Sequence, residues 1–139
     1  MIEITDLNHA ALVVRDMEAA RHFYCDILGM EVVPRPPGAP YNITWVRKGG
    51  AELHLMDQSE SPHEPGDKPA PHPPGRDPSL VRHIALEVKD ADAVERVLNE
   101  HGIPIVLGPR PRGDGATQIF CYDPDGHLVE LDALEQPQG

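Results

Sequence analysis

The stretch LNHAALVVRDMEAA (7–20) returns later in the chain as VRHIALEVKDADAV (81–94). A constant offset matches the two copies, and it places His83 opposite His9 (83 − 9 = 74). Each copy alternates apolar and mixed residues as a half-buried strand does, and then reaches an aspartate that can cap a helix. The repeat therefore predicts two strand-to-helix units.

Helical spacing follows both aspartates. After Asp16 the apolar side chains fall on one helix face, and Gly29 can adopt the left-handed conformation that ends a helix. Asp90 and Gly102 bound a second helix in the same way. Beyond each helix come short runs typical of strands: 30–34, 43–48 and 51–56 in the first half, and 103–107, 116–122 and 127–132 in the second. The pattern is βαβββ, twice.

The chain of 139 residues has the length of a single compact domain. Within it we predict an α+β fold in which module one covers 5–57 and module two covers 81–133. The intervening segment, 58–80, holds seven of the sixteen prolines, which is typical of a linker or lid.

Composition narrows the function classes. Hydrophobic residues make up 40% of the chain and charged residues 25%, as in globular proteins. A net charge of −11 disfavours nucleic acid and anionic membranes as partners. Cys25 and Cys121 have no metal-binding or redox spacing, and the N-terminus has no export signal, so we expect a cytoplasmic protein with reduced thiols.

The ends of the two halves also align. GAELHL (50–55) over GHLVEL (126–131) pairs His54 with Glu130. Because alternate side chains of a strand point to opposite faces, the apolar residues of these strands occupy one face and leave the other to polar groups. The polar face then carries four residues, two from each half: His9, His54, His83 and Glu130.

Three imidazoles and one carboxylate form a ligand set that suits one divalent ion of zinc, iron, nickel, manganese or cobalt. Glu52 competes with His54 for the position on the fourth strand, because both lie on the same strand face. We prefer His54, which aligns with Glu130 without a gap. Glu52 is then an alternative ligand or a carboxylate that orients an imidazole.

The sequence resembles the vicinal-oxygen-chelate superfamily, which includes glyoxalase I, methylmalonyl-CoA epimerase, extradiol dioxygenases, and fosfomycin and bleomycin resistance proteins. The resemblance spans residues 5–133 and rests on LNHAALVV, HIALEV and the closing YDPDGHLVEL. It implies paired βαβββ modules that form an open, cup-shaped mixed sheet around a metal. Such a sheet is often completed by a second subunit, so we expect a homodimer.

The resemblance also implies ligand positions. His9, His83 and Glu130 fall on the metal positions of the family, whereas the remaining position, commonly Glu or Gln in glyoxalase-like and epimerase-like members, is here His54. Extradiol dioxygenases use two histidines and one carboxylate, which would correspond to His9, His83 and Glu130.

Three functions remain open at this point. The first is a lyase or isomerase whose small substrate chelates the metal through neighbouring oxygens, with Glu130 and His54 as acid–base groups. The second is an iron(II) ring-cleaving dioxygenase, and the third is a drug- or metabolite-binding protein without catalysis. Candidate substrate-binding residues lie in the predicted loop 108–115 and on the strand 43–48: Arg110, Arg112, Trp45 and Arg47.

Overall fold

The computed structural model describes residues 1–38, 41–65 and 77–134. The chain divides into two compact units, Met1–Glu64 and Pro65–Gly139, and each contains one βαβββ module. The predicted α+β fold of two such modules is therefore confirmed. Part of the proline-rich linker, 66–76, lies outside the described residues.

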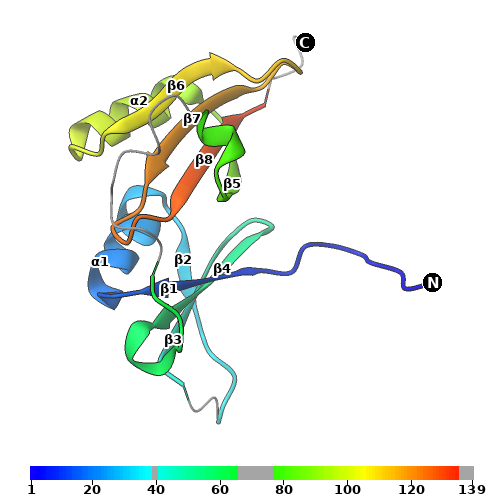
Figure 1. The fold of residues 1–139 in the computed structure, drawn as a ribbon, viewed down its shortest axis with the longest axis vertical. Coiled ribbons are helices and arrows are strands. Elements are labelled where there is room, and N and C mark those ends of the chain that lie inside the picture. Colours follow the sequence, from blue (N-terminus) through cyan, green and yellow to red (C-terminus); the bar gives the residue numbers. More distant parts are fainter. Residues whose placement is uncertain (39–40, 66–76, 135–139) are drawn as a thin grey trace. The chain divides into compact units, whose positions relative to one another are not determined.

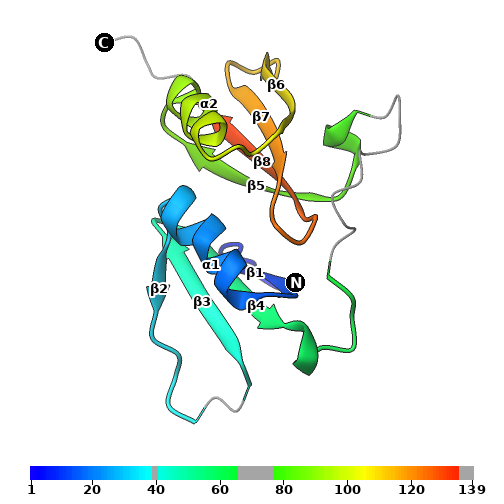
Figure 2. The ribbon, with the colours of Figure 1, turned by 90° about the vertical axis from the view of Figure 1, so that its left-hand side faces the viewer.

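Module one is a four-stranded mixed sheet with one helix against it (Figures 1 and 2). The strand order is β1-β4-β3-β2, in which β1 is parallel to β4 and the other neighbours are antiparallel. Residues 1–9 precede the first strand as an extended segment without regular structure. The elements are β1 (Ala10–Val14), α1 (Met17–Arg21), β2 (Glu31–Val33), β3 (Ile43–Lys48) and β4 (Ala51–Asp57).

The first helix forms where the sequence predicts it. The Asp16 side chain accepts hydrogen bonds from two backbone amides of the first turn, at 3.0 and 3.3 Å, as a helix cap does. After Arg21 the helix widens into π-helical turns, His22–Ile27, which bury Phe23 and Tyr24. Gly29 ends it with a φ of 82°, a conformation that glycine adopts at little cost.

Module two repeats this arrangement. Its strand order is β5-β8-β7-β6, with β5 parallel to β8, and its helix lies across one face of the sheet (Figure 2). Asp90 caps that helix through amides at 2.9 and 3.3 Å. The elements are β5 (His83–Val88), α2 (Ala91–Glu100), β6 (Ile105–Pro111), β7 (Thr117–Tyr122) and β8 (Leu128–Ala133). Short 3-10 turns occupy Gln58–Glu60 and Pro78–Leu80.

Strand register confirms the internal alignment. In module one β1 meets β4 with Ala11 opposite His54, and in module two β5 meets β8 with Ala85 opposite Glu130. The apolar faces of β1, β4 and β8 are buried as predicted, with Leu55 and Leu131 almost fully enclosed, and that of β5 is half-buried. His54 and Glu130 are therefore equivalent positions of the two modules.

The strand β6 differs from its prediction. It was expected at 103–107 with a loop over 108–115, but it runs from Ile105 to Pro111, so Arg110 lies in a strand. Register shifts on either side of Leu107 let β6 continue beside β7. Gly108 permits this close approach, because a Cβ there would lie 2.3 Å from the backbone oxygen of Gln118. Irregular strands of this kind lack the alternation on which sequence prediction relies.

No helix in the described part of the chain combines the length and apolarity that crossing a bilayer requires.

Candidate metal centre

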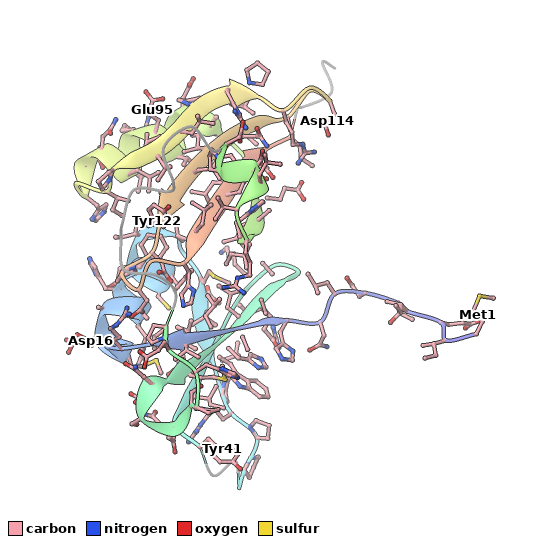
Figure 3. The ribbon with its side chains drawn as sticks, viewed as in Figure 1. Met1, Asp16, Tyr41, Glu95, Asp114 and Tyr122 are labelled. Carbon is pink, nitrogen blue, oxygen red and sulfur yellow. The ribbon has the colours of Figure 1, made fainter. Side chains whose placement is uncertain are left out.

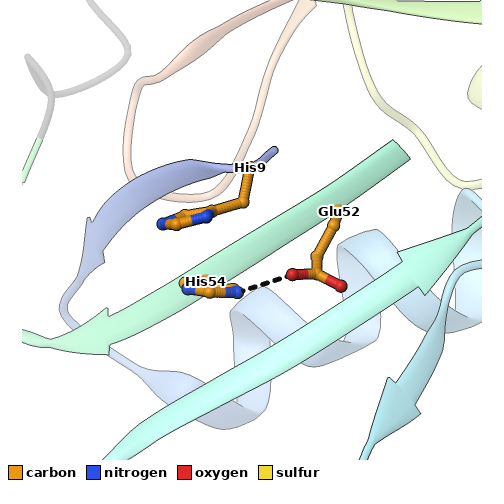
Figure 4. A group of neighbouring side chains, drawn as sticks. All are labelled: His9, Glu52 and His54. Carbon is orange, nitrogen blue, oxygen red and sulfur yellow. Dashed lines mark hydrogen bonds and ion pairs between the residues drawn. The ribbon is translucent and has the colours of Figure 1, made fainter. Parts of the chain in front are cut away.

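Module one brings together His9, Glu52 and His54 (Figure 4). One ligand atom from each residue lies within 4.8 Å of the others, which is close enough for a single ion to reach all three. His9 immediately precedes β1, and the other two residues lie on the same face of β4. Two imidazoles and a carboxylate suit a divalent transition metal, so the donor chemistry of the cluster fits the predicted ion.

Aromatic stacking fixes the orientation of the central imidazole. The His54 ring lies 3.8 Å from the His9 ring at an interplanar angle of 17°. On its other side the Trp45 ring lies 4.2 Å away at 3°. Trp45 is directly opposite His54 in the pairing of β3 with β4. The sandwiched ring therefore has little freedom to turn.

Hydrogen bonds select the nitrogen that each imidazole of module one can offer. The Nδ1 of His9 lies 2.7 Å from the side-chain oxygen of Asn8, an acceptor, so this nitrogen carries the proton and Nε2 keeps its lone pair. The Nε2 of His54 lies 2.9 Å from Glu52 and donates to that carboxylate, which leaves Nδ1 of His54 with its lone pair.

Glu52 connects His54 to an arginine of the neighbouring strand. Its carboxylate accepts a hydrogen bond of 2.7 Å from the Nε of Arg47 as well as the bond from His54. These hydrogen bonds hold the pKa of Glu52 below its ordinary value, and the bond from His54 has the larger effect. The carboxylate thus remains ionised beside the imidazole, an arrangement that orients metal-binding histidines in many proteins.

Module two brings together the other two predicted ligands. The Nε2 of His83 lies 3.6 Å from Oε1 of Glu130. The Nδ1 of His83 is 2.6 Å from the backbone oxygen of Val81 and must donate to it, so Nε2 keeps its lone pair on the side facing Glu130. The pair therefore offers a nitrogen lone pair and a carboxylate, and both groups can bind a cation.

Burial perturbs Glu130, which is only 5% exposed. Removal from water, followed by the neighbouring Asp132, raises the pKa of Glu130 from 4.5 to about 7, and His83 and Arg112 oppose this effect in part. A buried carboxylate with too little positive charge around it gains stabilisation from a bound cation. The chemistry of this pair therefore also fits a divalent ion.

Sequence reasoning missed two residues beside this pair. Phe120 is opposite Glu130 in the pairing of β7 with β8, just as Trp45 is opposite His54 in module one. Its ring meets that of His83 edge to face, with centroids 5.6 Å apart. Gln118 is buried and donates a hydrogen bond of 3.2 Å to Glu130. Extending the internal alignment to the third strand of each module would have found Phe120, but nothing in the sequence marks Gln118.

The two arginines predicted to bind substrate are engaged within module two. Arg110 reaches Asp77 through both terminal nitrogens, at 2.7 and 2.8 Å. Arg112 bonds to Asp114 and, at 3.2 Å, to the buried Asp132. Asp114 lies at the turn between β6 and β7 (Figure 3). Any substrate anion would have to share these guanidinium groups with carboxylates already bound to them.

Comparison with known proteins identifies the family. The Glyoxalase/Bleomycin resistance protein/Dioxygenase superfamily matches residues 6–131. The chain is 28% identical to "Glyoxylase I 4" of Arabidopsis thaliana over 94% of its own length and 71% of the relative's. It is 29% identical to the mitochondrial methylmalonyl-CoA epimerase of Bos taurus, over 91% and 73% of the two chains.

A solved structure gives the same fold. An antibiotic binding protein from Streptomyces sp. CB03234 superposes with a TM-score of 0.71 at 24% identity and covers 97% of this chain and all of the other. With repeated βαβββ modules and a family match across nearly the whole length, the chain belongs to the glyoxalase/bleomycin resistance protein/dioxygenase superfamily.

Proposed function

We propose that the protein is a metal-dependent lyase or isomerase acting on a small substrate that carries two neighbouring oxygen atoms. The observation that carries the proposal is the equivalence of two ligand pairs, His9 with His54 in module one and His83 with Glu130 in module two. Two relatives of the chain are named "Glyoxylase I 4" and methylmalonyl-CoA epimerase, and these names support an enzyme of the lyase or isomerase class.

The proposed ion, of zinc, iron, nickel, manganese or cobalt, is held by His9, His54, His83 and Glu130. Support comes from the free lone pairs, because His9 and His83 each direct Nδ1–H at a neighbouring oxygen and keep Nε2 for a metal. Glu52 is the alternative ligand to His54, since it belongs to the same cluster. Its bonds to both Arg47 and His54 favour an orienting role.

When bound, a divalent cation would polarise a substrate carbonyl and stabilise the negative charge that develops when a proton leaves the adjacent carbon. Glu130 is the proposed base. A carboxylate that leaves the ion in part could accept a proton and return it, and the charge of the ion would set its pKa. His54 is the second acid–base candidate, through the Nδ1 that its bond to Glu52 leaves free.

The surroundings of the ligands suggest how substrate is held. Trp45 covers one face of His54, and Arg47, Arg110 and Arg112 supply positive charge on β3, β6 and the following turn. We propose that these side chains contact the substrate beyond its chelating oxygens. We also propose that the protein is cytoplasmic and works as a homodimer, without nucleic acid or membrane partners.

Solvent exchange tests the proposed reaction. The full-length protein, loaded with Co²⁺, is incubated in deuterated water with methylmalonyl-CoA or hydroxyacetone, and the proton next to the carbonyl is followed by NMR. We expect one of these probes to lose that proton signal, because the carbon acid is deprotonated and then reprotonated from solvent. Glu130→Gln should abolish the exchange, whereas Glu87→Gln, an exposed carboxylate of β5, should preserve it. Loaded protein that exchanges neither probe contradicts the proposal.

An iron(II) ring-cleaving dioxygenase is the second candidate. Such enzymes bind iron through two histidines and one carboxylate and leave the other positions open. Two sets of residues have this composition: the predicted set of His9, His83 and Glu130, and the observed cluster of module one. Oxygen consumption that depends on catechol and Fe²⁺, without proton exchange in the probes above, would replace the first proposal with this one.

A binding protein without catalysis is the third candidate. The likeness to an antibiotic binding protein shows only the fold, but the net charge of −11 would suit a cationic ligand. Tight binding of a cationic drug by protein stripped of metal with a chelator, together with no turnover when loaded, would favour this function.

A further inference from the structure

A continuous set of hydrogen bonds in module two leads from the 3-10 turn before β5 to Glu130. Asp77 caps that turn and holds Arg110 through two bonds. The Nε of Arg110 donates to the side-chain oxygen of Gln118 at 3.0 Å. The side-chain nitrogen of Gln118 then donates to Oε1 of Glu130 at 3.2 Å. These groups come from three different strands and a turn.

The donors and acceptors of these groups fix the direction of each hydrogen bond in the set. A guanidinium has only donors, so the amide oxygen of Gln118 must face Arg110. The amide NH₂ must then face the carboxylate of Glu130, which accepts. Without Arg110, either end of the amide could turn toward the carboxylate, and an oxygen turned that way would repel it.

Arg110 is itself well held. Two parallel bonds to Asp77 form the planar, bidentate pairing that suits a guanidinium, and the Phe120 ring lies 6.0 Å below its central carbon. Gln118 is only 6% exposed, so water competes little for its amide. The carboxylate of Glu130 is thus aimed by a buried donor whose own orientation is set from the far side.

We propose that Gln118 is a positioning residue that holds Glu130 in its metal-binding geometry, and that Arg110 acts through Gln118. The inference rests on the proposed role of Glu130 as a metal ligand. Module one contains a parallel arrangement, in which Arg47 bonds Glu52 and Glu52 bonds His54. Each module would then hold its fourth-strand ligand through an intermediary fixed by an arginine.

The sign of one effect separates this role from simple electrostatics. Arg110 carries a positive charge, so its field opposes a cation bound at Glu130. Removing that charge alone would strengthen metal binding. If Arg110 instead sets the amide of Gln118, its removal weakens metal binding, because the carboxylate loses its fixed donor.

The test measures Co²⁺ affinity by isothermal titration calorimetry in the full-length protein. The variants are Gln118→Met, Arg110→Met and the double variant. Gln58→Met makes the same change at a glutamine whose amide donates to the exposed carboxylate of Glu64. Melting temperatures of the Co²⁺-free variants report separately on folding.

We expect Gln118→Met to weaken Co²⁺ binding about 10- to 100-fold, the range typical for groups that orient metal ligands. Arg110→Met should weaken it by a smaller factor, about three- to tenfold, and should add nothing in the Gln118→Met background. Gln58→Met should bind as the unaltered protein does.

Unchanged affinity in a folded Gln118→Met variant overturns the positioning role, and so does tighter binding by Arg110→Met. If Gln118→Met does not fold, the sign of the Arg110→Met effect decides alone. Failure of the unaltered protein to bind Co²⁺ overturns the proposed metal site together with this inference, whereas binding that the variants leave unchanged overturns the inference only.

Discussion

Replacing Glu130 by glutamine should stabilise the metal-free protein at alkaline pH. Glu130 is 5% exposed, and burial raises its pKa from 4.5 to about 7. Between pH 4.5 and about pH 7 the folded protein binds more protons than the unfolded chain, so the free energy of unfolding falls as the pH rises. Glutamine resembles the protonated carboxyl in shape and can donate a hydrogen bond to Asp132 as that carboxyl does. Because glutamine has no charge, its burial avoids the cost of removing an ionised group from water.

The size of the effect follows from the pKa difference. From 4.5 to about 7, at about 1.4 kcal/mol per pH unit, the ionised carboxylate costs ~3 kcal/mol above pH 8. Glu130→Gln should therefore equal the unaltered protein near pH 4.5 and exceed it by ~3 kcal/mol above pH 8. A divalent cation should remove the advantage, because it stabilises the carboxylate and not the amide.

The assay is urea denaturation followed by far-ultraviolet circular dichroism across this pH range, with a chelator present. Glu87→Gln, at an exposed position of β5, serves as the matched control and should show no pH-dependent advantage. A stability difference for Glu130→Gln that stays constant from acid to alkaline pH would refute the reasoning, because it would show that the buried carboxylate does not carry the titration.

Three further predictions concern other parts of the chain. Burial raises the pKa of Cys121 to about 12, so iodoacetamide should modify the half-buried Cys25 of the folded protein first, as intact mass spectrometry would show; equal rates would contradict this. Gly108→Ala should lower the free energy of unfolding in urea by about 1–3 kcal/mol, because Gly108 has a φ of +102° and a Cβ there would meet the backbone of β7. Gly50→Ala should change the stability little, because a Cβ there meets nothing within 4 Å. Trp45, the sole tryptophan, stacks on a proposed ligand, so saturating Co²⁺ should quench its fluorescence; unchanged emission would place the ion elsewhere.

The fold could be predicted because the sequence repeats the pattern of one βαβββ module. His9 and His83 start equivalent segments, and the aspartates that follow both cap helices in the structure. Hydrophobic alternation then assigned the strand faces correctly, since burial of one sheet face is the strongest constraint on a strand. What failed was the second half of β6, where Gly108 and the register shifts interrupt that alternation.

The strand positions of the candidate ligands could be predicted from the sequence, and the contacts that support them could not. Alignment of His54 with Glu130 selected equivalent strand positions, which register confirms. The bond between Glu52 and His54 follows from their spacing on one strand face. Gln118 reaches Glu130 diagonally between neighbouring strands, and such contacts depend on register and side-chain conformation that no local sequence pattern encodes.

Metal stoichiometry in three proteins tests the central claim most directly. The unaltered protein, His9→Ala and His83→Ala are equilibrated with Co²⁺, freed of unbound ion and analysed by elemental mass spectrometry. The proposed ligand set of His9, His54, His83 and Glu130 predicts one ion per unaltered chain and loss of the ion in either variant. Full retention by His83→Ala would contradict the account, because the ion would then be held by His9, Glu52 and His54 of module one alone.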